Sequence, residues 1–270
     1  MQGIGNDFVM VDTITEPLPA LDLAGLAKKT NDRRFGVGGD GLILLERGET
    51  APFRMRMFNP DGSESEMCGN GIRCFAKLLR DKGHLQTDNV DVETGAGTLH
   101  LEIVPSGMVK VNMGRARLTR EEIGMAGEPN AVYQDVPTET MAGTFPATAV
   151  SMGNPHLVLF VADASAIPLE IAGPELELHP LFPKRTNVHF IQVLDRQTLI
   201  QKTWERGAGI TLACGTGACA SAVAAFVTGR ADRNVEIRLP GGSLFIEYLE
   251  SGEVLMTGPA ETVFEGELAV

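Results

Sequence analysis

Two cysteines in the sequence are each flanked by small residues and glycines and followed by a helical pattern of apolar residues. Cys68 precedes the letters GNG, and Cys214 precedes GTG. A helix N-terminus presents free backbone N–H groups and the positive end of a dipole, which bind anions and favour a thiolate. The sequence therefore indicates two reactive thiols, each at the start of a helix.

Two such thiols suit the removal of a proton from one face of a stereocentre and its return to the other face. One thiol must be ionised and the other protonated, with the roles exchanged in the reverse direction. A regulatory disulfide between them is an alternative. A metal site is weakly supported, because two cysteines and His156 lack the local spacing of metal ligands. Cys74 and Cys219 lie inside helical patterns and are expected to be inert core residues.

The charge and the first residues limit the class of protein. A formal net charge of −12 argues against a nucleic acid or an anionic membrane as partner. The first residues have neither a basic start nor an apolar core, so no signal peptide is expected. The cysteines are then expected to be reduced thiols in the cytoplasm. The apolar run 209–226 is interrupted by glycines and is expected to form buried core rather than a membrane span.

Several motifs occur twice in the same order. The pair Gly-Asn at Asn6 returns at Asn154, the Cys68 motif returns at Cys214, and a Gly-rich hairpin start returns near residue 242. The offsets are about 145 to 148 residues, too long for a solenoid repeat. The chain is therefore expected to be an α+β protein of two pseudo-symmetric domains, each a mixed or antiparallel sheet wrapped round a central helix. Equivalent loops would then meet across a cleft, with the two cysteines on opposite walls.

Domain boundaries and elements follow from this duplication and from the local pattern. The expected halves are residues 1–115 and 116–258, with the tail 259–270 packing back on the first half. Helices are expected over 21–30, from Cys68 to Gly83 and from Cys214 to Gly229. Strands are expected at 8–11, 42–45, 53–58, 157–161 and 188–194, with hairpins at 98–113 and 243–256. Residues 118–145 are expected to form a connector with a short helix near 120–125.

The segment GVGGDG at residues 36–41 formally contains GxGxxG. A dinucleotide-binding fingerprint needs a strand before it and a helix after it, whereas a strand-like run follows here. A structural turn lining a pocket is the better interpretation, and no cofactor is expected.

The ordered motifs resemble those of the diaminopimelate epimerases, which interconvert LL- and meso-2,6-diaminopimelate without a cofactor. The resemblance rests on GIGNDF at Gly3, GVGGDG at Gly36, FNPDGSESEMCGNGIRC at Phe58, GNPH at Gly153, TNV at Thr186 and ERGAGITLACGTGACA at Glu205. These motifs span nearly the whole chain.

The resemblance implies a role for each matching residue. Cys68 and Cys214 are implied as the acid/base pair, and His156 and Glu205 as residues that adjust their pKa. The residues implied in substrate binding are Asn6, Asn59, Gly69, Asn70, Asn154, Asn187, Glu205, Arg206, Gly215 and Thr216. A homodimer is implied as well, with diaminopimelate as the small-molecule partner and no metal.

Three positions depart from the family pattern. Only Met1 and Gln2 precede the GIGNDF loop, where a short strand is usual, so either an edge strand is missing or the start codon is misassigned. Gly41 stands where some members have glutamine, and Ile210 where glutamate is frequent. Ile210 is not one of the implied site residues, so little effect is expected from it.

Two other functions remain open from the sequence. A proline or hydroxyproline racemase-type enzyme of the same superfamily also uses two cysteines, although Asn59, Asn187 and Arg206 suit a substrate with a second charged amino-acid end better than a ring. A catalytically silent amino-acid-binding or thiol-sensing protein is the alternative from another class. A phenazine-type isomerase is disfavoured because it lacks the cysteine pair.

Overall fold

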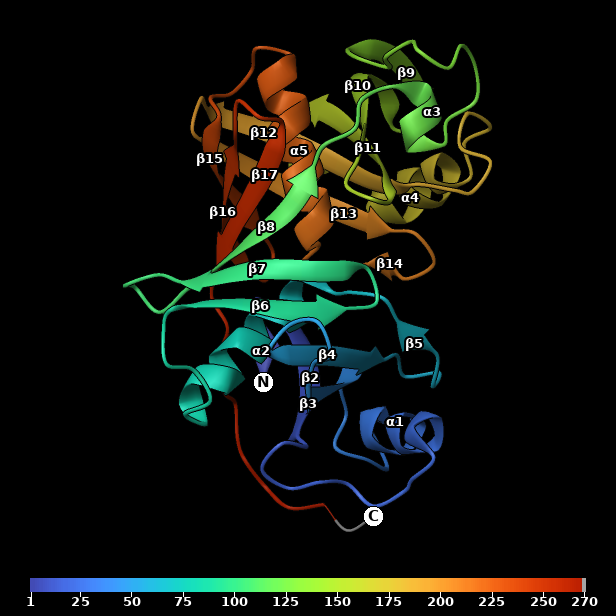
Figure 1. Cartoon of the computed structure of the whole chain (residues 1–270). Coiled ribbons are helices and arrows are strands. Elements are labelled where there is room, and N and C mark those ends of the chain that lie inside the picture. The colour runs from blue at the N-terminus through green and yellow to red at the C-terminus, as the bar shows by residue number, and fades with distance from the viewer. Residues whose placement is uncertain (269–270) are drawn as a thin grey trace. The chain divides into compact units, whose positions relative to one another are not determined.

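The computed structural model describes residues 1–268, and their internal contacts group them into two units. Unit 1 comprises Met1–Asn112 and the chain from Thr257, and unit 2 comprises Met113–Met256. Each unit is built mainly of strands, with few helices (Figure 1).

Unit 1 starts with two short antiparallel strands and continues as alternating strands and helices. Its elements are β1 (Gln2–Gly3), β2 (Asn6–Asp12), α1 (Leu23–Asn31), β3 (Gly41–Arg47), β4 (Phe53–Phe58), β5 (Glu64–Ser65), α2 (Gly69–Asp81), β6 (Asn89–Thr94), β7 (Gly97–Ile103) and β8 (Val109–Arg115), whose last residues belong to unit 2. The residues before the GIGNDF loop thus form β1, which pairs with β2.

Unit 2 adds a short helix and one strand before the same succession of elements. Its elements are α3 (Arg120–Ile123), β9 (Val136–Thr140), β10 (Gly143–Ser151), β11 (Pro155–Val161), the 3-10 turn Ala164–Ala166, α4 (Leu169–Glu177), β12 (Asn187–Asp195), β13 (Thr198–Glu205), β14 (Gly209–Ile210), α5 (Gly215–Val227), β15 (Asn234–Leu239), β16 (Gly242–Tyr248) and β17 (Glu253–Gly258), whose last two residues belong to unit 1.

The strand pairings repeat from one unit to the other. In unit 1, β2 and β3 are parallel, β3 and β4 antiparallel, β4 and β6 parallel, and β6 and β7 antiparallel. In unit 2, β11 and β12, β12 and β13, β13 and β15, and β15 and β16 pair in the same senses. The predicted α+β class and the internal duplication are confirmed by these matching pairings. The cleft expected between the two halves stays a prediction.

Each unit places one 13-residue helix against its strands. Helix α2 contacts β1, β2, β3 and β7, and α5 contacts β10, β11, β12, β15 and β16. Helix α5 is rich in alanine, the best helix former, and is buried on nearly all sides. Gly229 follows it with φ 74°, the left-handed conformation that ends many helices. Run 209–226 is therefore mostly buried core, as expected, and no described helix is long and apolar enough to cross a membrane.

The expected positions of Cys74 and Cys219 are confirmed, since both side chains are fully buried in their helices. The chain after Thr257 runs beside the start of unit 1, where the backbones of Gln2 and Glu261 exchange hydrogen bonds of 2.8 and 2.9 Å. The domain boundaries at 115/116 and 258/259 stay predictions, and residues 269–270 of the expected tail lie outside the described residues.

Candidate active site

Cys68 is the residue at which α2 begins. Its backbone is extended (φ −139°, ψ 119°), and its sulfur accepts a hydrogen bond from the backbone N–H of Gly71 at 3.5 Å. The thiol donates to Asn6 Oδ1, 3.7 Å from Sγ. The N–H groups of the first helical turn have no carbonyl partner within the helix. Cys68 is therefore half-buried beside an anion-binding helix start.

The side-chain amide of Asn6 has one orientation in unit 1. Its Nδ2 donates to the carboxylate of Asp40, which accepts only, and its Oδ1 accepts from Asn70 Nδ2 at 3.1 Å. Arg33 pairs with both Asp7 and Asp40 on the exposed side of this group. Asp40 thus holds the amide oxygen of Asn6 toward Asn70 and Cys68. Asn70 itself is 4% exposed, and its own Oδ1 is a buried atom without a partner among the described residues.

Cys214 occupies the equivalent position before α5 and is more deeply buried, at 5% exposed. Its Sγ lies 3.8 Å from Thr216 Oγ1. Burial and the nearby carboxylate of Glu205 raise the pKa of the Cys214 thiol, while hydrogen bonds from the Gly217 N–H and from Thr216 act to lower it. The thiol is therefore subject to opposing influences, which is a suitable state for a group that must both lose and gain a proton.

Asn154 and His156 stand beside Cys214 in unit 2. Asn154 Nδ2 donates to Thr216 Oγ1 at 3.4 Å, and its Oδ1 lies 2.9 Å from His156 Nε2. His156 is fully buried, and burial, the neighbouring His189 and Arg206 hold its pKa well below the ordinary value. His156 is therefore a neutral hydrogen-bonding group at neutral pH rather than a cation.

The strand-to-loop segment after β13 carries Glu205 and Arg206. Glu205 Oε1 accepts from the hydroxyl of Thr211 at 2.6 Å. The backbone N–H of Arg206 donates to Asn187 Oδ1 at 3.0 Å, while Asn187 Nδ2 donates to the carbonyl of Pro155 at 2.9 Å. Asn187 therefore uses both ends of its amide to hold the Arg206 loop to β11. Its predicted substrate contact stays a prediction.

The sequence-predicted residues thus form one group around each cysteine. Unit 1 brings together Cys68, Gly69, Asn70 and Asn6, and unit 2 brings together Cys214, Gly215, Thr216, Asn154, His156 and Glu205. Asn59 lies in the turn after β4, where its Nδ2 donates to Ser63 Oγ at 3.0 Å. The roles of these residues in catalysis and substrate binding stay predictions.

Two residues in contact with this group were missed by the sequence analysis. His189 lies 2.9 Å from His156 Nδ1, and Glu177 accepts from the Gly207 N–H at 3.1 Å. Residues two apart share one face of a strand, so the position of Asn187 in β12 was a signal for His189. Glu177 lies in a helix that the sequence pattern did not predict.

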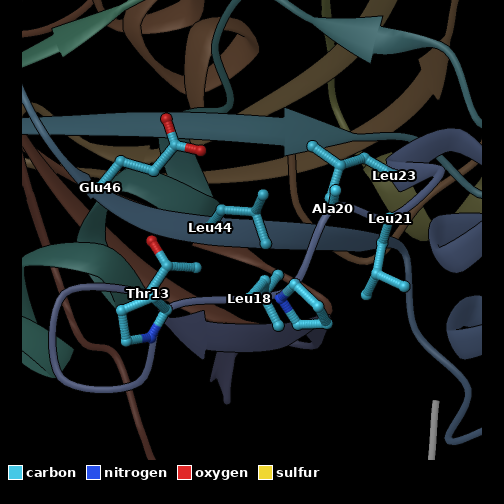
Figure 2. Close-up of a pocket in the computed structure, with 9 residues that line it drawn as sticks. Thr13, Leu18, Ala20, Leu21, Leu23, Leu44 and Glu46 are labelled. Carbon is cyan, nitrogen blue, oxygen red and sulfur yellow. The ribbon is translucent and has the colours of Figure 1, made fainter.

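The GVGGDG segment lacks the surroundings of a dinucleotide motif, and a surface hollow in the same unit has a different lining from the predicted site. GVGGDG follows α1 and precedes β3, the reverse of a dinucleotide motif. A surface hollow of about 390 Å³ lies beside β3 and is lined by Leu44, Glu46 and the chain 13–23 (Figure 2). It contains none of the predicted site residues. Among residues 1–268, no three His, Cys, Asp or Glu side chains are grouped to hold a metal ion.

Comparison with solved structures supports the fold. A PhzF-family phenazine biosynthesis protein of Bacillus anthracis is 20% identical, with a TM-score of 0.71 over 100% of this chain and 95% of the other. A hydroxyproline epimerase from Agrobacterium vitis is 15% identical, with a TM-score of 0.61 over 95% of this chain and 87% of the other. At these identities the likeness establishes a shared fold alone.

Comparison of sequences gives the family. The family described as diaminopimelate epimerase matches residues 1–119 and 148–263, on either side of the segment that contains α3 and β9. The diaminopimelate epimerase of Pelotomaculum thermopropionicum is 52% identical over 269 residues, covering 98% of this chain and 96% of the relative. That of Moorella thermoacetica is 52% identical over 272 residues, covering 99% and 97%. The chain therefore belongs to the diaminopimelate epimerase family.

Proposed function

We propose that this enzyme interconverts LL- and meso-2,6-diaminopimelate by proton transfer between the α-carbon and the thiols of Cys68 and Cys214. The observation that carries the proposal is the equivalence of the two cysteines. Each immediately precedes a 13-residue helix in one copy of a duplicated fold, in a chain about half identical to relatives named diaminopimelate epimerase.

One cysteine acts as thiolate and removes the α-proton, and the other acts as thiol and returns a proton to the opposite face. The electron pair of the broken C–H bond passes into the carbanion, where the carboxylate shares the charge. In the reverse direction the two cysteines exchange roles. No cofactor is needed to accept electrons, because the carbon changes configuration without being oxidised.

The helix starts supply the stabilisation that this carbanion needs. Backbone N–H groups at Gly69 and Asn70, and at Gly215 and Thr216, are free of helical carbonyl partners and bind the reacting carboxylate. They also stabilise the charge that develops on it.

The remaining site residues bind the substrate or adjust the pKa of the two thiols. Asn6, Asn59, Asn154, Asn187, Glu205 and Arg206 bind the amino and carboxylate groups of the substrate, and His156 and Glu205 adjust the thiols. A homodimer, which the family resemblance implies, and the expected cytoplasmic location belong to the same proposal.

Hydrogen exchange at the α-carbon tests the proposal. With α-deuterated LL-diaminopimelate in water, the enzyme is expected to release deuterium and form the meso isomer, and α-deuterated proline is expected to retain its label. Release from proline instead would favour the proline racemase alternative, and release from neither substrate would favour a binding protein.

Single replacements of the cysteines test the mechanism. Cys68→Ala and Cys214→Ala each leave one thiol, so epimerisation is lost while slow exchange survives from one diastereomer, with opposite preference in the two variants. Cys219→Ala is the matched control, because this thiol is fully buried in the same helix that follows Cys214. If folded Cys219→Ala were as inactive as Cys214→Ala, the assignment of Cys214 would be wrong.

A further inference from the structure

His189 is a second buried histidine behind the Cys214 group, and the proposed mechanism gives it no role. It lies in β12 and is fully buried. Its Nε2 is 2.9 Å from His156 Nδ1, and its Nδ1 is 3.0 Å from Thr203 Oγ1. Burial lowers the pKa of His189 to about 3, so the ring is neutral at the pH of the cell. A neutral imidazole donates from one nitrogen and accepts at the other.

The contacts of Asn154, beside Thr216 and Cys214, fix which nitrogen of His156 is the donor. Asn154 turns its Nδ2 to Thr216 and its Oδ1 to His156 Nε2. An amide oxygen only accepts, so His156 carries its proton on Nε2. His156 Nδ1 is then an acceptor, and the proton in the contact between the two rings belongs to His189 Nε2.

The far end independently requires the same arrangement. Gln201 Nε2, which only donates, lies 3.3 Å from His189 Nδ1 and 3.0 Å from Thr203 Oγ1. His189 Nδ1 must therefore be the acceptor, and the hydroxyl of Thr203 can donate a hydrogen bond to it. The two ends thus agree on the Nε2–H tautomer for both histidines. The hydrogen bonds form a chain that runs from Gln201 through the two histidines to Thr216. In each of them the donor lies on the Gln201 side and the acceptor on the Cys214 side.

Packing also brings His189 directly against the start of α5. A methyl group added at Gly217 would lie 2.3 Å from His189 Cε1 and 3.0 Å from Cys214 Sγ. The ring therefore contacts the first turn of the helix as well as His156. The backbone N–H of Gly217 acts to lower the pKa of the Cys214 thiol. The position of this ring and the surroundings of the thiol are consequently linked.

The equivalent contact in unit 1 has the opposite direction. There Asn70 donates to Asn6, because Asp40 accepts from the amide nitrogen of Asn6. In unit 2, Asn154 donates to Thr216, because His156 donates to its amide oxygen. The residue that gives the Asn154 amide the opposite orientation is thus His156. It does so only as long as His156 keeps its proton on Nε2.

We propose that His189 is a positioning residue that holds His156 in its Nε2–H tautomer, so that Asn154 donates to Thr216 and the Thr216 hydroxyl donates to Cys214. This inference rests on the proposed role of Cys214 as an acid/base residue. His189 acts through His156 and Asn154, and touches neither substrate nor the reacting carbon.

Nitrogen NMR of ¹⁵N-histidine-labelled protein tests the tautomer directly. The wild-type protein is expected to show His156 and His189 both protonated on Nε2 and unprotonated on Nδ1. His189→Gln retains a donor toward His156 Nδ1 and is expected to preserve the His156 signals, whereas His189→Leu has no donor and is expected to shift them. A His156 ring protonated on Nδ1 in the wild-type protein would overturn the inference.

Thiolate absorbance tests the consequence for Cys214. The titration is measured in a Cys68→Ala background, and the same background with Cys214→Ala is subtracted. His189→Leu is expected to raise the apparent pKa of Cys214 by about one unit, the size expected when one hydrogen bond to a thiolate is weakened. His189→Gln is expected to restore most of the shift. Glu205 is left unchanged throughout, because its carboxylate also raises the pKa of Cys214.

Two further variants keep the test decisive. Ser221→Ala removes a buried hydroxyl that has no partner among the described residues, in the same helix α5, and is expected to leave the titration unchanged. Thr203→Val removes one of the two donors to His189 Nδ1 and is expected to raise the apparent pKa of Cys214 less than His189→Leu does. This variant provides the test if His189→Leu does not fold. An unshifted titration in folded His189→Leu, or an equal shift in Ser221→Ala, would overturn the inference.

Turnover separates this inference from the proposed function. In the otherwise native enzyme, His189→Leu is expected to lower kcat about tenfold with a smaller change in KM, and His189→Gln to recover kcat. If the wild-type enzyme failed to epimerise diaminopimelate, the proposed function would fail, while the NMR and titration results would still decide the role of His189.

Discussion

The two glycines at the third residue after each cysteine offer a matched pair of substitutions. An alanine at Gly217 would place its methyl group 2.3 Å from His189 Cε1, 2.8 Å from His189 Nε2 and 3.0 Å from Cys214 Sγ. At Gly71 the corresponding contacts are 2.7 Å to Ile43 Cδ1 and 3.4 Å to Cys68 Cβ. The end of an isoleucine side chain moves easily, whereas the His189 ring is held at both nitrogens.

The expected stabilities follow from these contacts. Replacing glycine by alanine inside a helix stabilises it by about 1 kcal/mol, and this gain applies at both positions. Overpacking a rigid site costs about 1–3 kcal/mol, and this penalty applies fully only at Gly217. Gly71→Ala is therefore expected to lie within about 1 kcal/mol of the wild type, and Gly217→Ala about 2 kcal/mol below Gly71→Ala.

Urea unfolding measures this difference, as a lower midpoint at unchanged slope. Both variants keep the backbone N–H at the mutated residue, so loss of a hydrogen-bond donor does not enter the comparison. Gly217→Ala is also expected to reduce turnover, because the displaced ring no longer meets His156. Equal stabilities of the two variants would show that His189 moves as freely as Ile43 and would refute the reasoning.

Three further outcomes are expected. Cys74→Ala and Cys219→Ala should each lose about 1–3 kcal/mol of unfolding free energy, measured in urea, and keep the chemistry. Glu177→Gln should raise KM, measured in steady-state assays, because the carboxylate accepts from Trp204 Nε1 at 2.7 Å and from the Gly207 N–H beside Arg206. Burial acts to raise the pKa of Glu177, but the hydrogen bonds from Trp204, Gly207 and Arg185 outweigh it and lower the pKa. The ionised carboxylate should therefore stabilise the fold at pH values above 4.5, the ordinary pKa of a glutamate. This contribution should disappear as the pH falls below 4.5 and through the lowered pKa, and Glu177→Gln should show no such loss.

Elements with a strong local signal were predicted from the sequence. Strand β4 was predicted with its observed limits, and the helices after Cys68 and Cys214 begin where expected. These segments combine a clear apolar period with glycine or turn residues at their ends. The duplication was also predictable, because the repeated motifs lie in the loops that the fold reuses.

Elements whose pattern is set by tertiary contacts were missed. Helix α4 contains Pro174 and has no side-chain cap, so its sequence lacks a clear start and a regular interior. Strands β9 and β10 form a hairpin within and beyond the segment predicted as a connector. Strand β13 alternates buried and partly exposed residues but carries Gln201, Lys202 and Glu205, which obscure the pattern.

For the site, the sequence identified the residues at the helix starts better than the residues behind them. Cys68 and Cys214 carry a local signal, since a glycine-rich turn and a helix adjoin each of them. His189 carries only the weak signal of lying two residues after Asn187 in one strand, and Glu177 carries none, because their contacts join strands and helices that are distant in the sequence. Such contacts become visible only when the chain is folded.

The duplication gives both cysteines the same backbone setting, yet the side chains behind them differ in kind. Behind Cys68, carboxylates and Arg33 form an exposed charged group that fixes the Asn6 oxygen as an acceptor for the thiol proton. Behind Cys214, a chain of buried neutral groups leads to Thr216, whose hydroxyl we infer to donate to the sulfur, while the carboxylate of Glu205 raises the pKa of the thiol. Accepting from a sulfur favours its thiol, and donating to a sulfur favours its thiolate. The proposed mechanism needs one thiol and one thiolate at the start of each turnover, so the donation toward Cys214 that we infer would favour the thiolate there and oppose the effect of Glu205.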